Sequence, residues 1–143
     1  MNLNEFLTKI ESSEEFKEYK KKNTNSFLAD IFTIIKEKDK QLDWQFDYYS
    51  KSKDKITSFV IQNKEIQKKE AEIFRKDQCE ILKLNLNNIK IPIEKALEEI
   101  NKKTKEKPNE IIIVLQVINK KETWNITYLT TSFRTLNTKI NAK

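Results

Sequence analysis

The sequence predicts an α+β fold in which short helices pack against antiparallel β-hairpins. Apolar residues recur at the spacing of a helix face near the amino terminus and again after Pro92. Large aromatic residues alternate with polar ones in two other stretches, which start at Trp44 and at Trp124, and this alternation is typical of strands with one buried face. The 143 residues are enough for one domain with a modest core, so a single domain over 1–143 is expected.

Two short helices are expected at the amino terminus. Between positions 3 and 10 the apolar residues fall at i, i+3, i+4 and i+7, with Asn2 or Asn4 as the N-cap. Ser12 and Glu15 have the spacing of a capping box, which predicts the start of a second short helix.

A strand and a hairpin are expected next. The run over 27–35 is apolar and rich in β-branched residues, as in a buried strand. The alternation that begins at Trp44 is followed by a polar turn over 50–54 and a second alternating stretch, which together predict a hairpin. The segment over 63–79 has few apolar residues and is interpreted as a loop with one helical turn at most. The leucines over 81–86 favour a short strand or an extended edge.

The second half of the chain predicts a helix, a strand and another hairpin. Pro92 stands where it costs no hydrogen bond in a first helical turn, and apolar residues at helical spacing follow it to about Lys105. This helix is expected to pack on a sheet that contains Ile112 and Val114. The later alternating stretches predict the hairpin. Six residues on these stripes are expected in the core: Trp44, Tyr48, Trp124, Tyr128, Leu97 and Ile100.

The two halves of the chain are similar at a spacing of eighty residues. Without a gap, Trp44 aligns with Trp124 and Tyr48 with Tyr128. This similarity predicts two α-β-β-β units, over 1–62 and 81–143, joined by an irregular segment over 63–80.

The stretches Trp124-Asn125-Ile126-Thr127-Tyr128 and 135–142 resemble the closing hairpin of a PepSY domain. The helix over 93–100 and the strand over 111–117 precede them in the order of that family, and the whole chain resembles small archaeal PepSY-like proteins of unassigned function. The resemblance implies a cystatin-like arrangement and a role in binding peptides or restraining proteases, with no catalytic residue. PepSY units usually have Asp where Asn141 stands, followed by Thr-Gly.

The absence of glycine and histidine excludes many kinds of active site. Average usage would supply roughly ten glycines, and without them the chain cannot build a Gly-rich phosphate loop, a dinucleotide fingerprint or a nucleophile elbow. Without histidine it has no Ser-His-Asp or Cys-His pair and no imidazole metal ligand. No catalytic residue, metal site or cofactor is expected, and the protein is not expected to be an enzyme.

Charge and cysteine content limit the partners and the cellular compartment that can be expected. The net charge of +6 is spread along the chain rather than gathered, and only Arg75 and Arg134 are arginines, so no specific nucleic-acid binding is expected. Cys79 is the single cysteine and forms no internal disulfide, which suits a cytoplasmic protein. No apolar run reaches the roughly 20 residues of a membrane span.

The expected function is a non-enzymatic module that binds an unidentified protein or peptide, as a monomer or homodimer. Non-specific nucleic-acid binding by a basic surface is the alternative. Phe133 is a large aromatic in a polar turn beside Arg134, a combination that suits an acidic or extended peptide. The other candidate binding residues are the nearby basic side chains and an aromatic expected on the polar face of the first hairpin: Lys120, Lys121, Lys139 and Tyr49.

Overall fold

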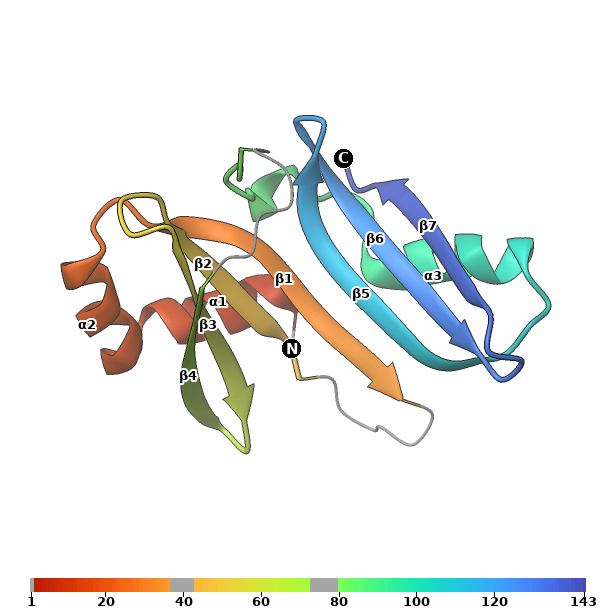
Figure 1. Ribbon diagram of the computed structural model, residues 1–143, viewed down its shortest axis with the longest axis horizontal. Helices are drawn as coiled ribbons and strands as arrows, with labels where there is room; N and C mark the ends of the chain where they lie inside the picture. Colours follow the sequence, from red (N-terminus) through yellow and green to blue (C-terminus); the bar gives the residue numbers. More distant parts are fainter. Residues whose placement is uncertain (1, 37–42, 73–79) are drawn as a thin grey trace.

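The protein is built on one seven-stranded antiparallel sheet with the strand order β4-β3-β2-β1-β5-β6-β7 (Figure 1). The computed structural model describes residues 2–36, 43–72 and 80–143. In chain order the elements are α1 (Leu3–Glu11), α2 (Glu14–Lys22), β1 (Phe27–Lys36), β2 (Gln45–Ser50), β3 (Lys55–Gln62), β4 (Glu65–Glu72), η1 (Leu86–Asn88), α3 (Ile93–Lys103), β5 (Pro108–Ile118), β6 (Lys121–Thr130) and β7 (Thr135–Asn141).

The expected α+β fold with a cystatin- or PepSY-like arrangement is wrong. Strands make up 46% and helices 25% of the structure, and all the described strands belong to one sheet. The fold is therefore dominated by its sheet. Within 1–62, the first predicted α-β-β-β unit has two helices before its three strands, and a fourth strand, β4, follows it.

The segment over 63–80 is not wholly irregular, because β4 occupies Glu65–Glu72 and pairs with β3 along its length. Its sequence carries charged residues on both faces, as is common in edge strands that must not pair with another chain. Because this composition lacks hydrophobic alternation, the sequence pattern did not predict the strand. Residues 73–79, with Cys79, lie outside the described residues.

The leucine stretch over 81–86, which was expected to be a short strand or an extended edge, does not form a strand. The amide of Leu84 donates to the carbonyl of Leu28 (2.8 Å), and the chain then enters the short 3-10 helix η1. At the amino terminus, Asn2 caps α1, and Ser13 rather than Ser12 caps α2 by accepting from the amide of Phe16.

The centre of the sheet is the β1/β5 ladder, which is symmetric about one residue pair. Thr33 pairs with Ile113, its counterpart eighty positions later, and the flanking pairs Phe32–Val114 and Ile34–Ile112 are counterparts of each other. The register shifts in the β1/β2 and β5/β6 ladders also fall eighty residues apart, after Leu28 and after Pro108. A duplication stays a prediction.

The strand pairing within the two hairpins does not keep the eighty-residue spacing. Ile31 pairs with Phe46, whereas its counterpart Ile111 pairs with Tyr128, so the two ladders differ by two residues from an ungapped alignment. Because side chains alternate with a period of two, this even shift leaves each residue on the same face. Trp44 and Trp124 consequently share a face without sharing a register position.

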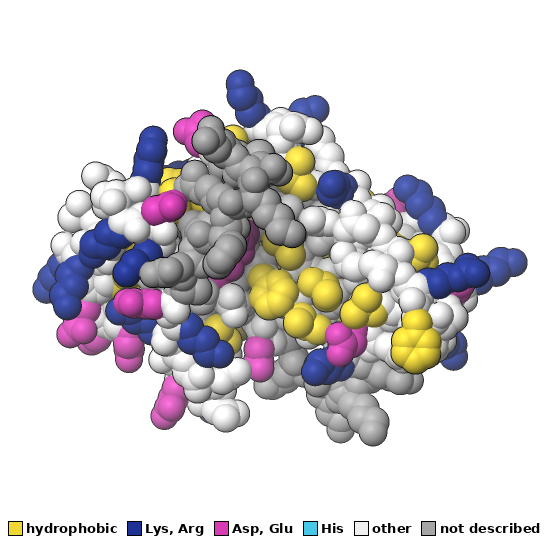
Figure 2. All heavy atoms as spheres, viewed as in Figure 1, with side chains coloured by type: hydrophobic (Ala, Val, Ile, Leu, Met, Phe, Trp, Pro, Cys, Tyr) yellow, Lys and Arg dark blue, Asp and Glu magenta, His cyan; other side chains and the backbone are white. Residues whose placement is uncertain are grey.

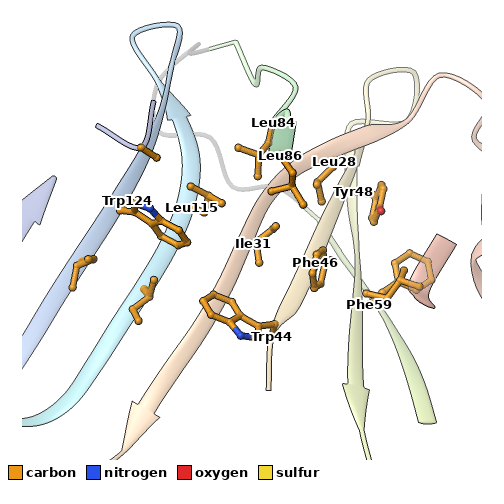
Figure 3. Packing of buried hydrophobic residues seen from close by; sticks show 14 of the residues in the cluster. Leu28, Ile31, Trp44, Phe46, Tyr48, Phe59, Leu84, Leu86, Leu115 and Trp124 are labelled. Carbon is orange, nitrogen blue, oxygen red and sulfur yellow. The ribbon is translucent and has the colours of Figure 1, made fainter. Parts of the chain in front are cut away.

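The helices cover one face of the sheet, which also carries the largest buried side chains (Figure 3). Phe16 of α2 lies 4.9 Å from Tyr48 and 5.5 Å from Phe59 between ring centroids. On the other half, Ala96 and Ile100 of α3 are buried, whereas Leu97 is half-buried. The buried residues of both halves belong to one hydrophobic cluster.

The prediction that α3 packs against Ile112 and Val114 is wrong, because the neighbouring residues of β5 face the helix instead. Ile113 and Leu115 are fully buried on the helix-covered face, whereas Ile112 and Val114 point to the opposite face and are half-buried. The periodicity of a continuous apolar run does not reveal which alternate set faces the helix.

The face without helices, here called the open face, is partly apolar. Figure 2 shows hydrophobic side chains gathered near its middle, over β1, β5 and β6. By register, Phe32 and Ile34 lie on this face beside Val114 and Ile112, and Ile34 is 37% exposed.

The hairpin turns adopt left-handed backbone conformations without glycine. Two two-residue turns, Asn63-Lys64 and Asn119-Lys120, have positive φ at both positions, as type I′ turns require. Asparagine tolerates this region, whereas lysine adopts it at a cost of about 1–2 kcal/mol. Among the described residues, Asp54 and Phe133 also have positive φ, and both lie in hairpin turns.

Candidate binding cleft

A cleft of about 1000 Å³ lies on the helix-covered side, where α1 and α3 begin. Its volume is at the upper end of the range for ligand sites in proteins. Figure 1 shows the two helices running from the middle of the molecule in opposite directions. Residues from both helix starts, the β3–β4 turn and the floor of the sheet line the cleft: Asn2, Leu3, Asn4, Phe6, Lys9, Asp43, Trp44, Ile61, Asn63, Lys64, Leu86, Ile89, Lys90, Pro92, Ile93, Glu94 and Trp124.

Trp124 fixes the start of α3 at the cleft. Its indole Nε1 donates to the carbonyl of Ile91 (2.8 Å), and Trp124 is 1% exposed. The amides of Lys90 and Ile91 both donate to the carbonyl of Ala142, at 2.7 and 3.0 Å. The approach to α3 is thus held by a core side chain and by the segment that follows β7.

The first turn of α3 has no side-chain cap, because Pro92 occupies the N-cap position. The amides of Lys95 and Ala96 donate to the carbonyl of Pro92. Within the described residues, no acceptor is found for the amides of Ile93 and Glu94, which are free donors as at any uncapped helix start. In α1, by contrast, the side chain of Asn2 accepts from the amide of Glu5 (2.9 Å).

Trp44 contributes a second kind of donor to the cleft floor. Its side chain lies on the same side of the sheet as Trp124 (Figure 3), and the residue is 6% exposed. Unlike Trp124, its indole N–H makes no hydrogen bond to any described residue. The floor therefore holds one indole donor bonded to the backbone and one whose nitrogen is not among the buried unpartnered polar atoms.

The charged residues of the lining have a small positive excess. Lys9, Lys64 and Lys90 face Asp43 and Glu94 around the cleft. None of the three lysines forms an ion pair within the part of the chain that the structure describes. These ammonium groups remain available to a negatively charged ligand.

The binding residues predicted from the sequence do not form one site. Phe133 is 96% exposed in the β6–β7 turn, and Arg134 beside it lies 3.5 Å from Glu106. Lys120 and Lys121 lie at the other end of β6, a strand of 10 residues that spans about 30 Å. The predicted proximity of these groups is wrong, since the β5–β6 and β6–β7 turns lie at opposite ends of β6.

Two further predicted residues lie elsewhere. Lys139 is exposed on β7 opposite Asn125, on the open face. Tyr49 was expected to be exposed but is 3% exposed, and its hydroxyl donates to Asp54 Oδ1 (2.6 Å). That contact and the T-shaped packing of its ring on Phe27 (5.7 Å) remove Tyr49 from the accessible surface.

A carboxyl pair on the open face was missed by the sequence analysis. Asp30 and Asp47 are opposite each other on β1 and β2, and Asp47 Oδ1 also accepts from Ser58 Oγ (2.6 Å) and Gln45 Nε2 (2.9 Å). Burial, the hydrogen bond with Asp47 and the charge of Asp47 raise the pKa of Asp30 to about 9. The pair shares a proton at neutral pH, which explains how two carboxyl groups can be adjacent.

Two other buried hydroxyls have raised pKa values. Burial, followed by the charge of Glu11, raises the pKa of Tyr48 well above the usual range. Burial also raises the pKa of Tyr128, whose hydroxyl donates to Asn101 Oδ1 (2.8 Å). Both tyrosines act as neutral donors that tie a helix to the sheet. Over the described ranges, no three acidic or cysteine side chains gather as a metal site would require.

No protein-family model, curated protein or solved structure matches the chain. The role implied by the resemblance to PepSY-like proteins accordingly stays a prediction, whereas the cystatin-like arrangement that it implied differs from the sheet-dominated fold. None of the described helices has both the length and the apolar character needed to cross a membrane.

Proposed function

We propose that the protein is a non-enzymatic peptide-binding module and that the cleft between the starts of α1 and α3 is its binding site. The observation that carries this proposal is the cleft itself, with about 1000 Å³ of space above two large aromatic side chains. Binding sites are typically concave, mostly apolar and equipped with a few polar groups that set the orientation of the ligand.

The lining has the composition that a peptide needs. Phe6, Ile61 and Ile93 are half-buried and offer apolar surface, while Asn4 and Asn63 offer amide groups that can bond to a peptide backbone. No histidine is available for acid–base or metal chemistry, which favours binding over catalysis. A cytoplasmic location, suggested by the single cysteine, belongs to the same proposal.

Peptide selection with a blocked variant tests this function. A library of random peptides is panned on the purified protein, and the dissociation constants of enriched peptides are measured by fluorescence anisotropy. Asn4→Tyr places a ring at an exposed position of the cleft wall and should weaken binding at least tenfold. Glu98→Tyr is the matched control, because it adds the same ring to an exposed position of α3 outside the cleft.

Two outcomes would contradict the proposal. Equal affinities for Asn4→Tyr and the wild type would place the peptide elsewhere. If no peptide is enriched and labelled oligonucleotides bind at about 0.15 M salt with steep salt dependence, the basic surface is the functional one and the protein binds nucleic acid without sequence preference.

A further inference from the structure

We propose that two copies of the chain associate through the open faces of their sheets. The interface is centred on four apolar side chains of β1 and β5, here called the apolar square: Phe32, Ile34, Ile112 and Val114. The cleft lies on the opposite, helix-covered side, so this inference does not depend on the proposed function.

The apolar square lies where an antiparallel sheet normally carries polar residues. Such sheets commonly leave one face to water, and polar side chains then occupy the outward positions. Ile34 is instead 37% exposed, and the other three side chains of the apolar square are half-buried, with none of the described helices over them. Figure 2 shows hydrophobic side chains gathered near the middle of this face, with charged side chains around them. An apolar group of this kind indicates a contact surface.

The strand register makes the apolar square complementary to a second copy of itself. Phe32 lies opposite Val114 and Ile34 opposite Ile112, on either side of the Thr33–Ile113 pair. In a two-fold dimer the same patch serves both partners. A two-fold axis through the centre of the apolar square, in the plane of the interface, therefore lays apolar side chains on apolar side chains in either direction along or across the strands.

The charges on this part of the open face favour an identical partner over a strongly charged one. The strands β1, β5, β6 and β7 place two acidic and two basic residues around the apolar square: Asp30, Glu110, Lys36 and Lys139. Lys36 and Glu110 already form an ion pair with each other (3.9 Å). A strongly acidic or basic partner would meet no opposite excess of charge here, whereas a second copy carries the same balanced set.

The polar side chains next to the apolar square can lose water at little cost. On β7, the amide Nδ2 of Asn137 donates to Asn125 Oδ1 (2.7 Å) and to Thr127 Oγ1 (2.9 Å). Asn125 and Thr127 lie opposite Val114 and Ile112 on β6. Because these groups bond to one another within the chain, a partner can cover them without leaving donors unpaired.

The area is sufficient for a specific interface. On the open face, β1, β5, β6 and β7 each contribute four residues that lie opposite one another across the strands. With strands about 4.8 Å apart and residues of one face about 6.6 Å apart, this region measures about 19 Å by 26 Å, or about 500 Å². Two copies bury about 1000 Å² together, the lower limit for a biological interface. We therefore expect a dimer in equilibrium with its monomer, with the two clefts on its outer sides.

The mass of the protein in solution tests this inference. Sedimentation equilibrium from about 1 μM to about 1 mM covers the affinities of small interfaces. We expect the mass to rise with concentration from 17.1 kDa towards twice this value. The dissociation constant should change less than about threefold between 0.1 and 1 M NaCl, because the contact of the apolar square needs no intermolecular ion pair.

Three variants locate the interface. Ile34→Lys puts a charge into the apolar square of both copies and should weaken dimerisation at least a hundredfold. Ile34→Thr keeps the β-branched shape, should weaken dimerisation at least threefold, and decides the test if circular dichroism shows that Ile34→Lys does not fold. Thr8→Lys is the matched control, because it adds the same charge to an exposed position of α1 outside the cleft and should leave the dimer unchanged.

The inference has two ways to fail. A wild type that keeps the mass of one chain at every concentration would overturn it and would leave the open face to water or to a different protein. A dimer that folded Ile34→Lys and Ile34→Thr form as tightly as the wild type would overturn it too, since the copies would then meet through another surface.

Discussion

Asp30 is expected to make the protein less stable as the pH rises, and its replacement by asparagine should remove this effect. In the folded state, burial and the neighbouring Asp47 raise the pKa of Asp30 from 3.8 to about 9. The folded protein therefore keeps a proton on Asp30 at neutral pH, whereas the unfolded chain has lost it. Asp30→Asn keeps a neutral side chain of similar shape, whose amide can donate to Asp47.

The sign and size of the effect follow from proton binding. Between the two pKa values the folded state binds one more proton than the unfolded state, so the free energy of unfolding falls by at most about 1.4 kcal/mol per pH unit. Below this window both states are protonated, and above it both are ionised. Because Asp30 is only partly shielded from water, we expect the total loss between pH 5 and pH 8 to be about 2 kcal/mol.

Urea unfolding at pH 5, 6, 7 and 8, followed by tryptophan fluorescence, measures this loss. Asp30→Asn should be nearly insensitive to pH over this range and more stable than the wild type at pH 8. Asp43→Asn is the control, since Asp43 is exposed and its removal should leave the slope of the wild type. Parallel curves for Asp30→Asn and the wild type would refute the shared proton.

Three other variants test the turns and the anchor of α3. Trp124→Phe leaves the carbonyl of Ile91 without its donor and should lower the free energy of unfolding by about 1–3 kcal/mol; an unchanged urea midpoint would show that water replaces the indole. Lys120→Gly relieves a left-handed residue (φ 65°) and should raise the free energy of unfolding in urea by up to about 1 kcal/mol; a lowered urea midpoint would show that the added freedom of the unfolded chain outweighs this relief. Phe133→Ala with Arg134→Ala should change the stability by less than about 1 kcal/mol in thermal unfolding, because both side chains are exposed; cooperative destabilisation would mean that the turn is part of the core.

Local alternation was sufficient to predict which tryptophan-bearing stretches face the core. Trp44 and Trp124 each alternate with polar neighbours, and both are buried on the helix-covered face. Alternation gave no such signal for β4, since Lys68 and Lys69 face opposite sides of a strand whose position at the edge requires no buried face. A hydrophobic pattern reports burial, so a strand that buries little is not recognised by it.

Strand register explains why the carboxyl pair was missed. In the sequence, the acidic residue nearest to Asp47 is Asp43, four positions earlier, and about 13 Å of extended chain between them excludes a direct interaction. The partner is Asp30, which lies 17 positions earlier within an apolar run and becomes adjacent only when β1 pairs with β2. Cross-strand neighbours depend on the register and on bulges, such as the one that follows Leu28, and neither is visible in composition.

The cleft depends on the same long-range order. Lys9, Lys64 and Lys90 come from a helix, a hairpin turn and the segment before α3, and no motif links them in the sequence. They meet because the β1/β5 ladder, centred on Thr33 and Ile113, places the two halves of the sheet side by side with their helices on one face. The start of α1 and the start of α3 then line one cavity, whose floor includes Trp44 and Trp124. If the cleft binds a peptide as proposed, its specificity is therefore a property of how the two halves join, and substitutions that loosen the β1/β5 ladder should weaken peptide binding before they unfold either half.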